Sequence, residues 1–160
     1  MGLNQYLSES NILLGLEAES SRDVIRQLGQ TLLEDGYVKE SYIDAVINRE
    51  KTLPTGLPLD GDVNVAIPHT DIEHVNKSAV AMASLVKPVT FQNMVNPSES
   101  VEVKIVFLLA LEEPHAQIEM LQEVAGVVQN ADVLRALLAA TDPKEVLLAF
   151  EKTETDSVSE

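Results

Sequence analysis

Three histidines, His69, His74 and His115, supply most of the reactive chemistry in this 160-residue chain, which contains no cysteine. His69 and His115 each stand directly after a proline, and each proline follows a run of apolar residues. Near pH 7 a neutral imidazole is both a nucleophile and a proton carrier. If the two apolar runs lie close together in one sheet, both imidazoles emerge at the same edge. This pattern favours a phosphohistidine site that needs no metal.

The two histidines are expected to do different work at such a site. Phosphoryl transfer depends mostly on positioning and charge stabilisation, so the acceptor must be exposed and held stiffly. Pro68 fixes its own φ and restricts Ile67, which helps to aim His69. His115 opens a predicted helix, whose N–H groups and positive dipole end suit a phosphate. The alternative interpretation is that each histidine is a loop residue with a local hydrogen bond.

Apolar periodicity places these residues in an α/β fold. Val24, Leu28 and Leu32 recur at helical spacing between the N-cap candidate Ser20 and the stop signal Gly36. Prolines and glycines in residues 53–61 predict a loop. Strands are predicted over residues 11–16, 63–67, 79–86 and 101–111. Three helices are predicted to begin near Ser21, Tyr42 and Pro114, and two more are predicted over residues 133–140 and 144–150.

The alternation of strands and helices predicts a three-layer α/β sandwich, with a central mixed sheet of four to five strands and helices on both faces. Residues 101–111 are β-branched and then continuously apolar, which is typical of an interior strand. The length indicates one domain, predicted over residues 1–150. The polar and acidic segment 151–160 is predicted to be a disordered tail.

Charge and hydropathy exclude several classes of function. Lys and Arg number 11 against 26 Asp and Glu, giving a net charge of −15, which disfavours nucleic acid and anionic membranes. The longest apolar run, Ile105–Leu111, has seven residues, whereas a membrane span needs about 20. With no signal segment in the first ten residues, a cytoplasmic protein that does not insert into the membrane is expected. A metal hydrolase using His69, Asp71, His74 and His115 is a weaker alternative, because that spacing fits no familiar zinc pattern. Neither a metal nor a cofactor is expected.

Two stretches, Arg49–Leu57 and Val63–Asp71, resemble the type-2 IIA domains of the bacterial sugar phosphotransferase system, in the fructose/mannitol superfamily. The shared pattern is Arg-Glu, a short gap, Thr-Gly, and then Ala-Ile-Pro-His. Lys104–Ala110 and Glu113–Gln117 resemble the segment around the second histidine of that family. The sequences Pro-Thr-Gly-Leu-Pro-Leu and Ile-Pro-His-Thr-Asp are most similar to those of the galactitol-type branch. The resemblance extends from about Leu13 to Phe150.

The resemblance implies a phosphotransferase that acts as a phosphoryl relay. His69 takes a phosphoryl group from the small carrier protein phospho-HPr and passes it to a sugar-specific IIB component, so that the membrane component IIC is engaged only indirectly. His115 supports the phosphate and the transition state, and the fixed charge of Arg49 helps to hold phosphate oxygens or a partner carboxylate. Hydroxyl contacts to phosphate are expected from Thr55 and Thr70. The implied system takes up a galactitol-like sugar.

Other charged residues near the motifs are given structural interpretations. Glu50 is interpreted as a surface partner of nearby lysines and His74 as a solvated loop residue. Asp71 could orient an imidazole or cap a turn, and the turn is the preferred interpretation. An alternative function also remains: a stand-alone regulatory IIA-like protein whose phosphorylation controls partner binding. Neighbouring genes for IIB and IIC components would favour the transport relay over that alternative.

Overall fold

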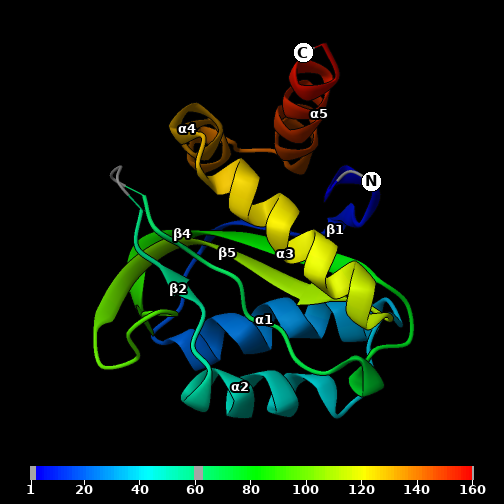
Figure 1. Cartoon of the computed structure of the whole chain (residues 1–160), viewed down its shortest axis with the longest axis vertical. Coiled ribbons are helices and arrows are strands. Elements are labelled where there is room, and N and C mark those ends of the chain that lie inside the picture. The colour runs from blue at the N-terminus through cyan, green and yellow to red at the C-terminus, as the bar shows by residue number, and fades with distance from the viewer. Residues whose placement is uncertain (1–2, 60–62, 160) are drawn as a thin grey trace.

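A five-stranded mixed sheet forms the centre of the protein in a computed structural model, which describes residues 3–59 and 63–159 (Figure 1). The strand order is β1-β4-β5-β3-β2, in which β1 pairs parallel to β4, β4 antiparallel to β5, β5 parallel to β3 and β3 antiparallel to β2. The strands are β1 (Leu7–Leu16), β2 (Gly56–Leu57), β3 (Val65–Ala66), β4 (Ala79–Gln92) and β5 (Ser100–Ala110). The predicted mixed sheet is confirmed, and β5 occupies its middle.

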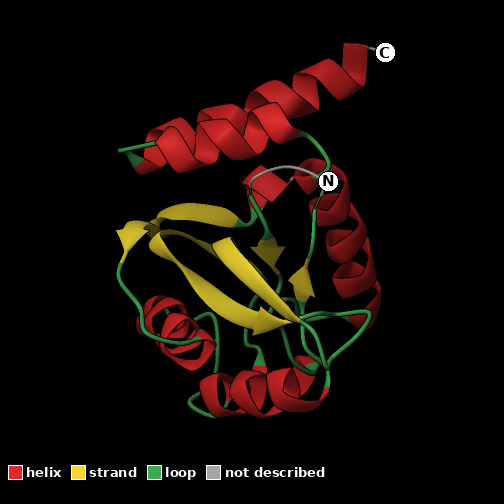
Figure 2. Ribbon diagram, turned by 90° about the vertical axis from the view of Figure 1, so that its left-hand side faces the viewer, coloured by secondary structure: helices red, strands yellow, loops and turns green. Residues whose placement is uncertain are grey.

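Helices cover both faces of this sheet, as Figures 1 and 2 show. One face carries α1 (Ser21–Glu34) and α2 (Tyr42–Thr52); the other carries α3 (Pro114–Val128), α4 (Ala131–Ala139) and α5 (Pro143–Ser159). Two 3₁₀ turns complete the described elements, η1 (Leu3–Gln5) and η2 (Ile72–His74). Because successive side chains of a strand point to opposite faces, β5 feeds two cores. Val106 and Leu108 belong to the core under α1 and α2, and Ile105 and Phe107 belong to the core under the other helices. This double burial explains the continuous apolar run in that strand.

Local signals set the ends of the first two helices. The Ser20 side chain accepts a hydrogen bond from the Asp23 N–H at the start of α1, and Gly36 follows the end of α1 with φ of 80°. Both features match the predicted cap and stop signal. At the start of α2, the Tyr42 hydroxyl donates to the Leu109 carbonyl at 2.6 Å, and burial raises the pKa of this phenol. This bond fastens α2 to the end of β5.

Several predicted boundaries are wrong in ways that reflect packing. The predicted loop over residues 53–61 contains the short strand β2, although Asp60 and Gly61 lie outside the described residues. Gly56 permits the close approach of β2 to the end of β4, because a Cβ there would lie 2.6 Å from the Gln92 carbonyl oxygen. Strand β3 covers only Val65–Ala66 of the predicted 63–67, and β4 continues past Val86 to Gln92 through an irregularity after Ser84.

The C-terminal helix runs further than the sequence pattern indicates. The backbone of α5 is helical through Ser159, so the predicted domain boundary at residue 150 falls inside a helix. The disorder predicted for residues 151–160 stays a prediction, and Glu160 lies outside the described residues. Across the described part of the chain, no helix combines the length and the apolar character needed to cross a membrane.

Candidate active site

The backbones of His69 and His115 lie at the same edge of the sheet. Strands β3 and β5 are parallel neighbours, with Val65 opposite Ile105, so both leave the sheet at that edge. The Leu109 N–H donates to the Pro68 carbonyl at 3.0 Å, which continues the pairing up to the residue before His69. The predicted common edge is therefore confirmed.

The first turn of α3 contacts the segment that carries His69. Gln117 donates through Nε2 to the Thr70 carbonyl at 3.4 Å. His115 stands two residues earlier, in the turn that Pro114 begins. The reach of the two imidazoles toward a shared phosphate stays a prediction.

His69 is buried, with 7% of its surface exposed, so the expectation of an exposed acceptor is wrong. Its Nδ1 lies 2.9 Å from the Ile67 carbonyl oxygen. A carbonyl can only accept, so Nδ1 carries the proton and Nε2 carries the free lone pair. Burial lowers the pKa of His69; the positive charge of Arg49 lowers it further, while the Ile67 bond and Asp71 act in the opposite direction. The ring is thus a neutral imidazole at pH 7, with Nε2 as its nucleophilic atom.

The last turn of α2 brings two consecutive charged residues to this segment. A guanidinium nitrogen of Arg49 lies 3.8 Å from a carboxylate oxygen of Asp71. The Arg49 Nε is shielded from solvent and has no hydrogen-bond partner among the described residues. The charge of Arg49 lowers the pKa of His69, and its predicted role in holding phosphate oxygens stays a prediction.

Glu50 does not lie on the surface beside lysines, and that interpretation is wrong. Its carboxylate accepts from the Thr55 N–H at 2.8 Å and from the Thr55 hydroxyl at 2.9 Å. Burial raises the pKa of Glu50 to about 7, although both Thr55 bonds and the charge of Arg49 oppose the rise. The sequence offered one signal for this contact, because Glu50 stands inside the Arg-Glu and Thr-Gly pattern.

The two threonines lie beside His69 in different ways. Thr55 is 2% exposed, and its carbonyl accepts from the Ile67 N–H at 3.3 Å. Because its hydroxyl hydrogen is directed at Glu50, Thr55 can donate to a phosphate only if that bond breaks. Thr70 is also buried and directly follows His69.

The other two histidines have carboxylate neighbours. His115 is exposed, and its Nε2 lies 3.1 Å from a carboxylate oxygen of Glu119, one turn along α3. His74 is not a solvated loop residue as predicted: it closes η2, only 22% of its side chain is exposed, and its Nδ1 lies 2.7 Å from the Ser41 hydroxyl. Among residues 3–59 and 63–159, no group of three or more His, Asp or Glu side chains is arranged to hold a metal.

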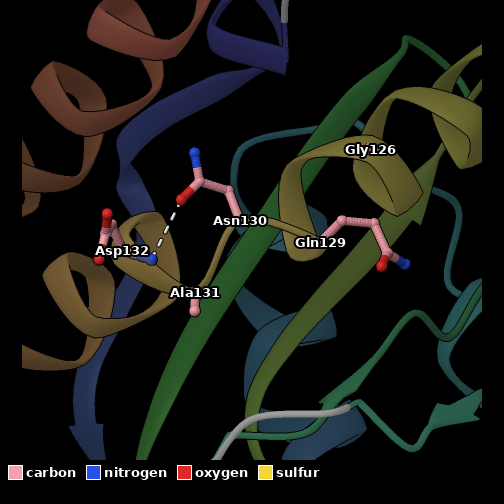
Figure 3. Close-up of a pocket in the computed structure, with 5 residues that line it drawn as sticks. All are labelled: Gly126, Gln129, Asn130, Ala131 and Asp132. Atoms are coloured by element: carbon pink, nitrogen blue, oxygen red, sulfur yellow. Dashed lines mark hydrogen bonds between the residues drawn. The ribbon is translucent and has the colours of Figure 1, made fainter.

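A polar pocket of about 450 Å³ lies at the other end of α3, away from His115 (Figure 3). It is lined by Gly126, Gln129, Asn130, Ala131 and Asp132. The Asn130 side chain accepts from the N–H groups of Asp132 and Val133, so it caps α4. The Gln129 side chain points away from this cap. The pocket is explained by the helix junction.

The protein is therefore an α/β sandwich in which two histidines follow neighbouring strands at one edge of a mixed sheet. Residues 5–153 match the family model described as the phosphoenolpyruvate-dependent sugar phosphotransferase system, EIIA 2. The chain belongs to this family, so the resemblance drawn from its motifs is confirmed.

Individual relatives agree with this assignment. The chain is 32% identical over 149 residues to the mannitol-specific EIICBA component of Pasteurella multocida, covering 91% of this chain and 22% of that protein. It thus spans about a fifth of the length of the mannitol-specific relatives. It is 29% identical over 124 residues to the galactitol-specific EIIA component of Escherichia coli, covering 78% of this chain and 81% of that protein.

Solved structures of the family share the fold. The complex of mannitol enzyme IIA with phosphorylated mannitol enzyme IIB from Escherichia coli matches with a TM-score of 0.74 and 27% identity, covering 91% of this chain and 97% of the matched one. The predicted three-layer α/β architecture is therefore confirmed.

Proposed function

We propose that this chain is a phosphoryl carrier that accepts a phosphoryl group on Nε2 of His69 and passes it to a IIB component. One observation carries the proposal: the hydrogen bond from His69 Nδ1 to the Ile67 carbonyl. This bond fixes the proton on Nδ1, and the lowered pKa keeps the ring neutral, so a lone pair is available on Nε2. The proposed carrier domain covers residues 1–150.

Transfer to His69 is a displacement at phosphorus. The Nε2 lone pair forms a bond to the phosphorus atom, while the bond from phosphorus to the donor imidazole breaks and its electron pair stays on the donor nitrogen. The negative charge on the transferring oxygens needs positive or hydrogen-bonding partners. We assign this role to the guanidinium of Arg49, to the imidazole of His115 and to the hydroxyl of Thr70. The buried, unpartnered Arg49 Nε supports its part in this set, because it has a hydrogen bond to gain.

The partners proposed for the chain are phospho-HPr as donor and a sugar-specific IIB component as acceptor. The match to a solved complex of mannitol IIA with phosphorylated IIB supports the acceptor. The sugar proposed is galactitol-like; the sequences Pro-Thr-Gly-Leu-Pro-Leu and Ile-Pro-His-Thr-Asp and the 29% identity over 124 residues to the galactitol-specific EIIA component support that choice. Contact with the membrane component IIC is proposed only through IIB, and the location is cytoplasmic.

The test combines phosphoenolpyruvate, enzyme I and HPr with the full chain and follows the phosphoryl group. We expect an acid-labile, alkali-stable phosphohistidine on the wild-type protein and none on His69→Gln. His74→Gln is the matched control, because it changes an imidazole outside the proposed site. Labelling of His69→Gln at the wild-type rate contradicts the assignment. Labelling of the wild-type protein without delivery to galactitol or mannitol IIB proteins favours the regulatory alternative.

A further inference from the structure

The five residues from Ile67 to Asp71 are held on both sides of His69 by the last turn of α2. Glu50 reaches the side before His69 through Thr55, and Arg49 reaches the side after it through Asp71. The two contacts come from consecutive residues of one helix, so they move together. Since Tyr42 fastens the start of that helix to the carbonyl of Leu109, the helix is itself fixed to the end of β5.

A series of hydrogen bonds, joined through the backbones of Thr55 and Ile67, connects Glu50 to the imidazole of His69. Glu50 accepts two bonds from Thr55, the Thr55 carbonyl accepts from the Ile67 N–H, and the Ile67 carbonyl accepts from Nδ1 of His69. Ile67 therefore receives its support on one side and orients the imidazole on the other. Any shift of Thr55 is passed to the carbonyl that decides which nitrogen of His69 carries the proton.

The contacts at the two neighbouring carbonyls come from elsewhere in the fold. Pro68 is held by the Leu109 N–H, and Thr70 is held by the Gln117 side chain. These bonds fix the path of the backbone around His69. The Leu109 bond lies directly after the Ile67–Pro68 peptide, and the Thr55 bond to the Ile67 N–H lies directly before it, so Thr55 supports the side of that peptide that the other contacts do not reach.

We propose that Glu50 is a positioning residue for His69, which holds Thr55 so that the Ile67 carbonyl keeps the imidazole in its Nδ1–H form with Nε2 free. The proposal rests on the proposed function only in taking His69 as the phosphoryl acceptor. Glu50 acts through two other residues and is not assigned a contact with the phosphoryl group.

The electrostatics of Glu50 support a role beyond stability. Burial raises the pKa of its carboxyl to about 7, so the ionised form is disfavoured in the folded protein. A charge removed from water contributes little to the stability of the fold, because its desolvation opposes folding. The same charge forms strong hydrogen bonds to an N–H and a hydroxyl, which is what fixing a loop requires.

The first experiment needs no phosphoryl donor. The tautomer of His69 is read from ring ¹H–¹⁵N correlation spectra of the full chain at pH 8, for the wild type, Glu50→Leu, Glu50→Gln and Thr55→Val. We expect the Nδ1–H form in the wild type, a mixture of both tautomers in Glu50→Leu and recovery of the Nδ1–H form in Glu50→Gln, whose amide oxygen still accepts from Thr55. Asp44→Asn, an exposed change on the same helix, is the matched control and keeps the wild-type spectrum.

Thr55→Val keeps the side-chain shape and removes only the hydroxyl contact, so it decides the matter if Glu50→Leu does not fold. We expect it to give a smaller admixture of the second tautomer. A wild-type ring spectrum in Thr55→Val, together with one in Glu50→Leu if that variant folds, overturns the proposal.

The second experiment measures uptake of phosphate from phospho-HPr by the same variants. A displacement of about 1 Å at a reacting atom can reduce a rate on the order of 10²-fold, which is the loss expected for Glu50→Leu. Glu50→Gln and Asp44→Asn remain close to the wild type. Because Glu50 and Thr55 act as one unit, the double variant Glu50→Leu/Thr55→Val is no slower than Glu50→Leu alone. Unchanged uptake by Glu50→Leu, or fully additive losses, contradicts the proposal. A wild-type protein that is never labelled contradicts the proposed function instead, and the ring spectra still test the positioning role.

Discussion

Replacing Glu50 with glutamine removes a pH-dependent contribution to stability that the structure allows us to size. Burial raises the pKa of this carboxyl from 4.5 to about 7, which is about 2.5 pH units. At about 1.4 kcal/mol per pH unit, the folded protein loses about 3.5 kcal/mol of stability when Glu50 ionises completely. The carboxyl is mostly buried, so solvent screening removes little of this amount.

The sign follows from which state binds the proton more tightly. The folded protein holds the Glu50 proton up to about pH 7, whereas the unfolded chain releases it near pH 4.5. The stabilising contribution is therefore complete below pH 4.5 and is lost as the pH rises through 7. Glutamine does not titrate. The free energy of unfolding of Glu50→Gln minus that of the wild type thus rises by about 3 kcal/mol between pH 4.5 and pH 8.

The assay is urea unfolding of both proteins at pH 4.5, 5.5, 6.5, 7.5 and 8, with stability taken from linear extrapolation. His69 titrates in part of this range with the opposite effect, because its lowered pKa removes stability as the pH falls below 6.5. It is present in both proteins, so it cancels in the difference. Asp44→Asn, measured in the same way, is the control for loss of an exposed carboxylate on α2. A flat difference for Glu50→Gln refutes the reasoning.

Three further predictions test the neighbours of His69. His115→Ala still takes up phosphate on His69 but delivers it to IIB on the order of 10²–10³ times more slowly, because a stabilising donor is missing in the transition state. Measuring uptake and delivery separately checks this. Full activity in both half-reactions makes His115 structural. Arg49→Gln raises the pKa of His69, since the guanidinium charge lowers it, and ring titration by NMR detects the change; an unaltered titration means that Arg49 does not act on that ring. Gly56→Ala destabilises the fold by about 1–3 kcal/mol, because the new Cβ meets the Gln92 carbonyl at 2.6 Å, and a urea midpoint equal to the wild type contradicts this.

The elements whose signals are local could be predicted from the sequence alone. The Ser20 cap, the apolar spacing of α1 and the glycine that follows it depend on contacts within a few residues, so they are readable without a fold. The same holds for the proline that opens α3 and for the apolar run of β5. The motif around His69 was also readable, because its residues are close together in the chain.

The sequence predicted that the two histidines lie at one edge of the sheet only on a condition. It required the strands before them to be parallel neighbours, and the pairing of β3 with β5 satisfies that condition. Nothing local specifies this pairing, because the two strands are separated by β4 in the chain. The sheet order arises from which apolar faces can be buried together.

The surroundings of His69 depend on long-range packing and could not be predicted from the sequence. Burial of the ring depends on residues brought over it from distant parts of the chain, and the sequence pattern indicated exposure instead. The carboxylate of Glu50 faces Thr55 because α2 ends beside β2, so a residue that looks like a surface charge becomes a half-buried acceptor with a raised pKa. Burial and pKa are properties of the packed environment of a group, and that environment does not exist until the chain has folded.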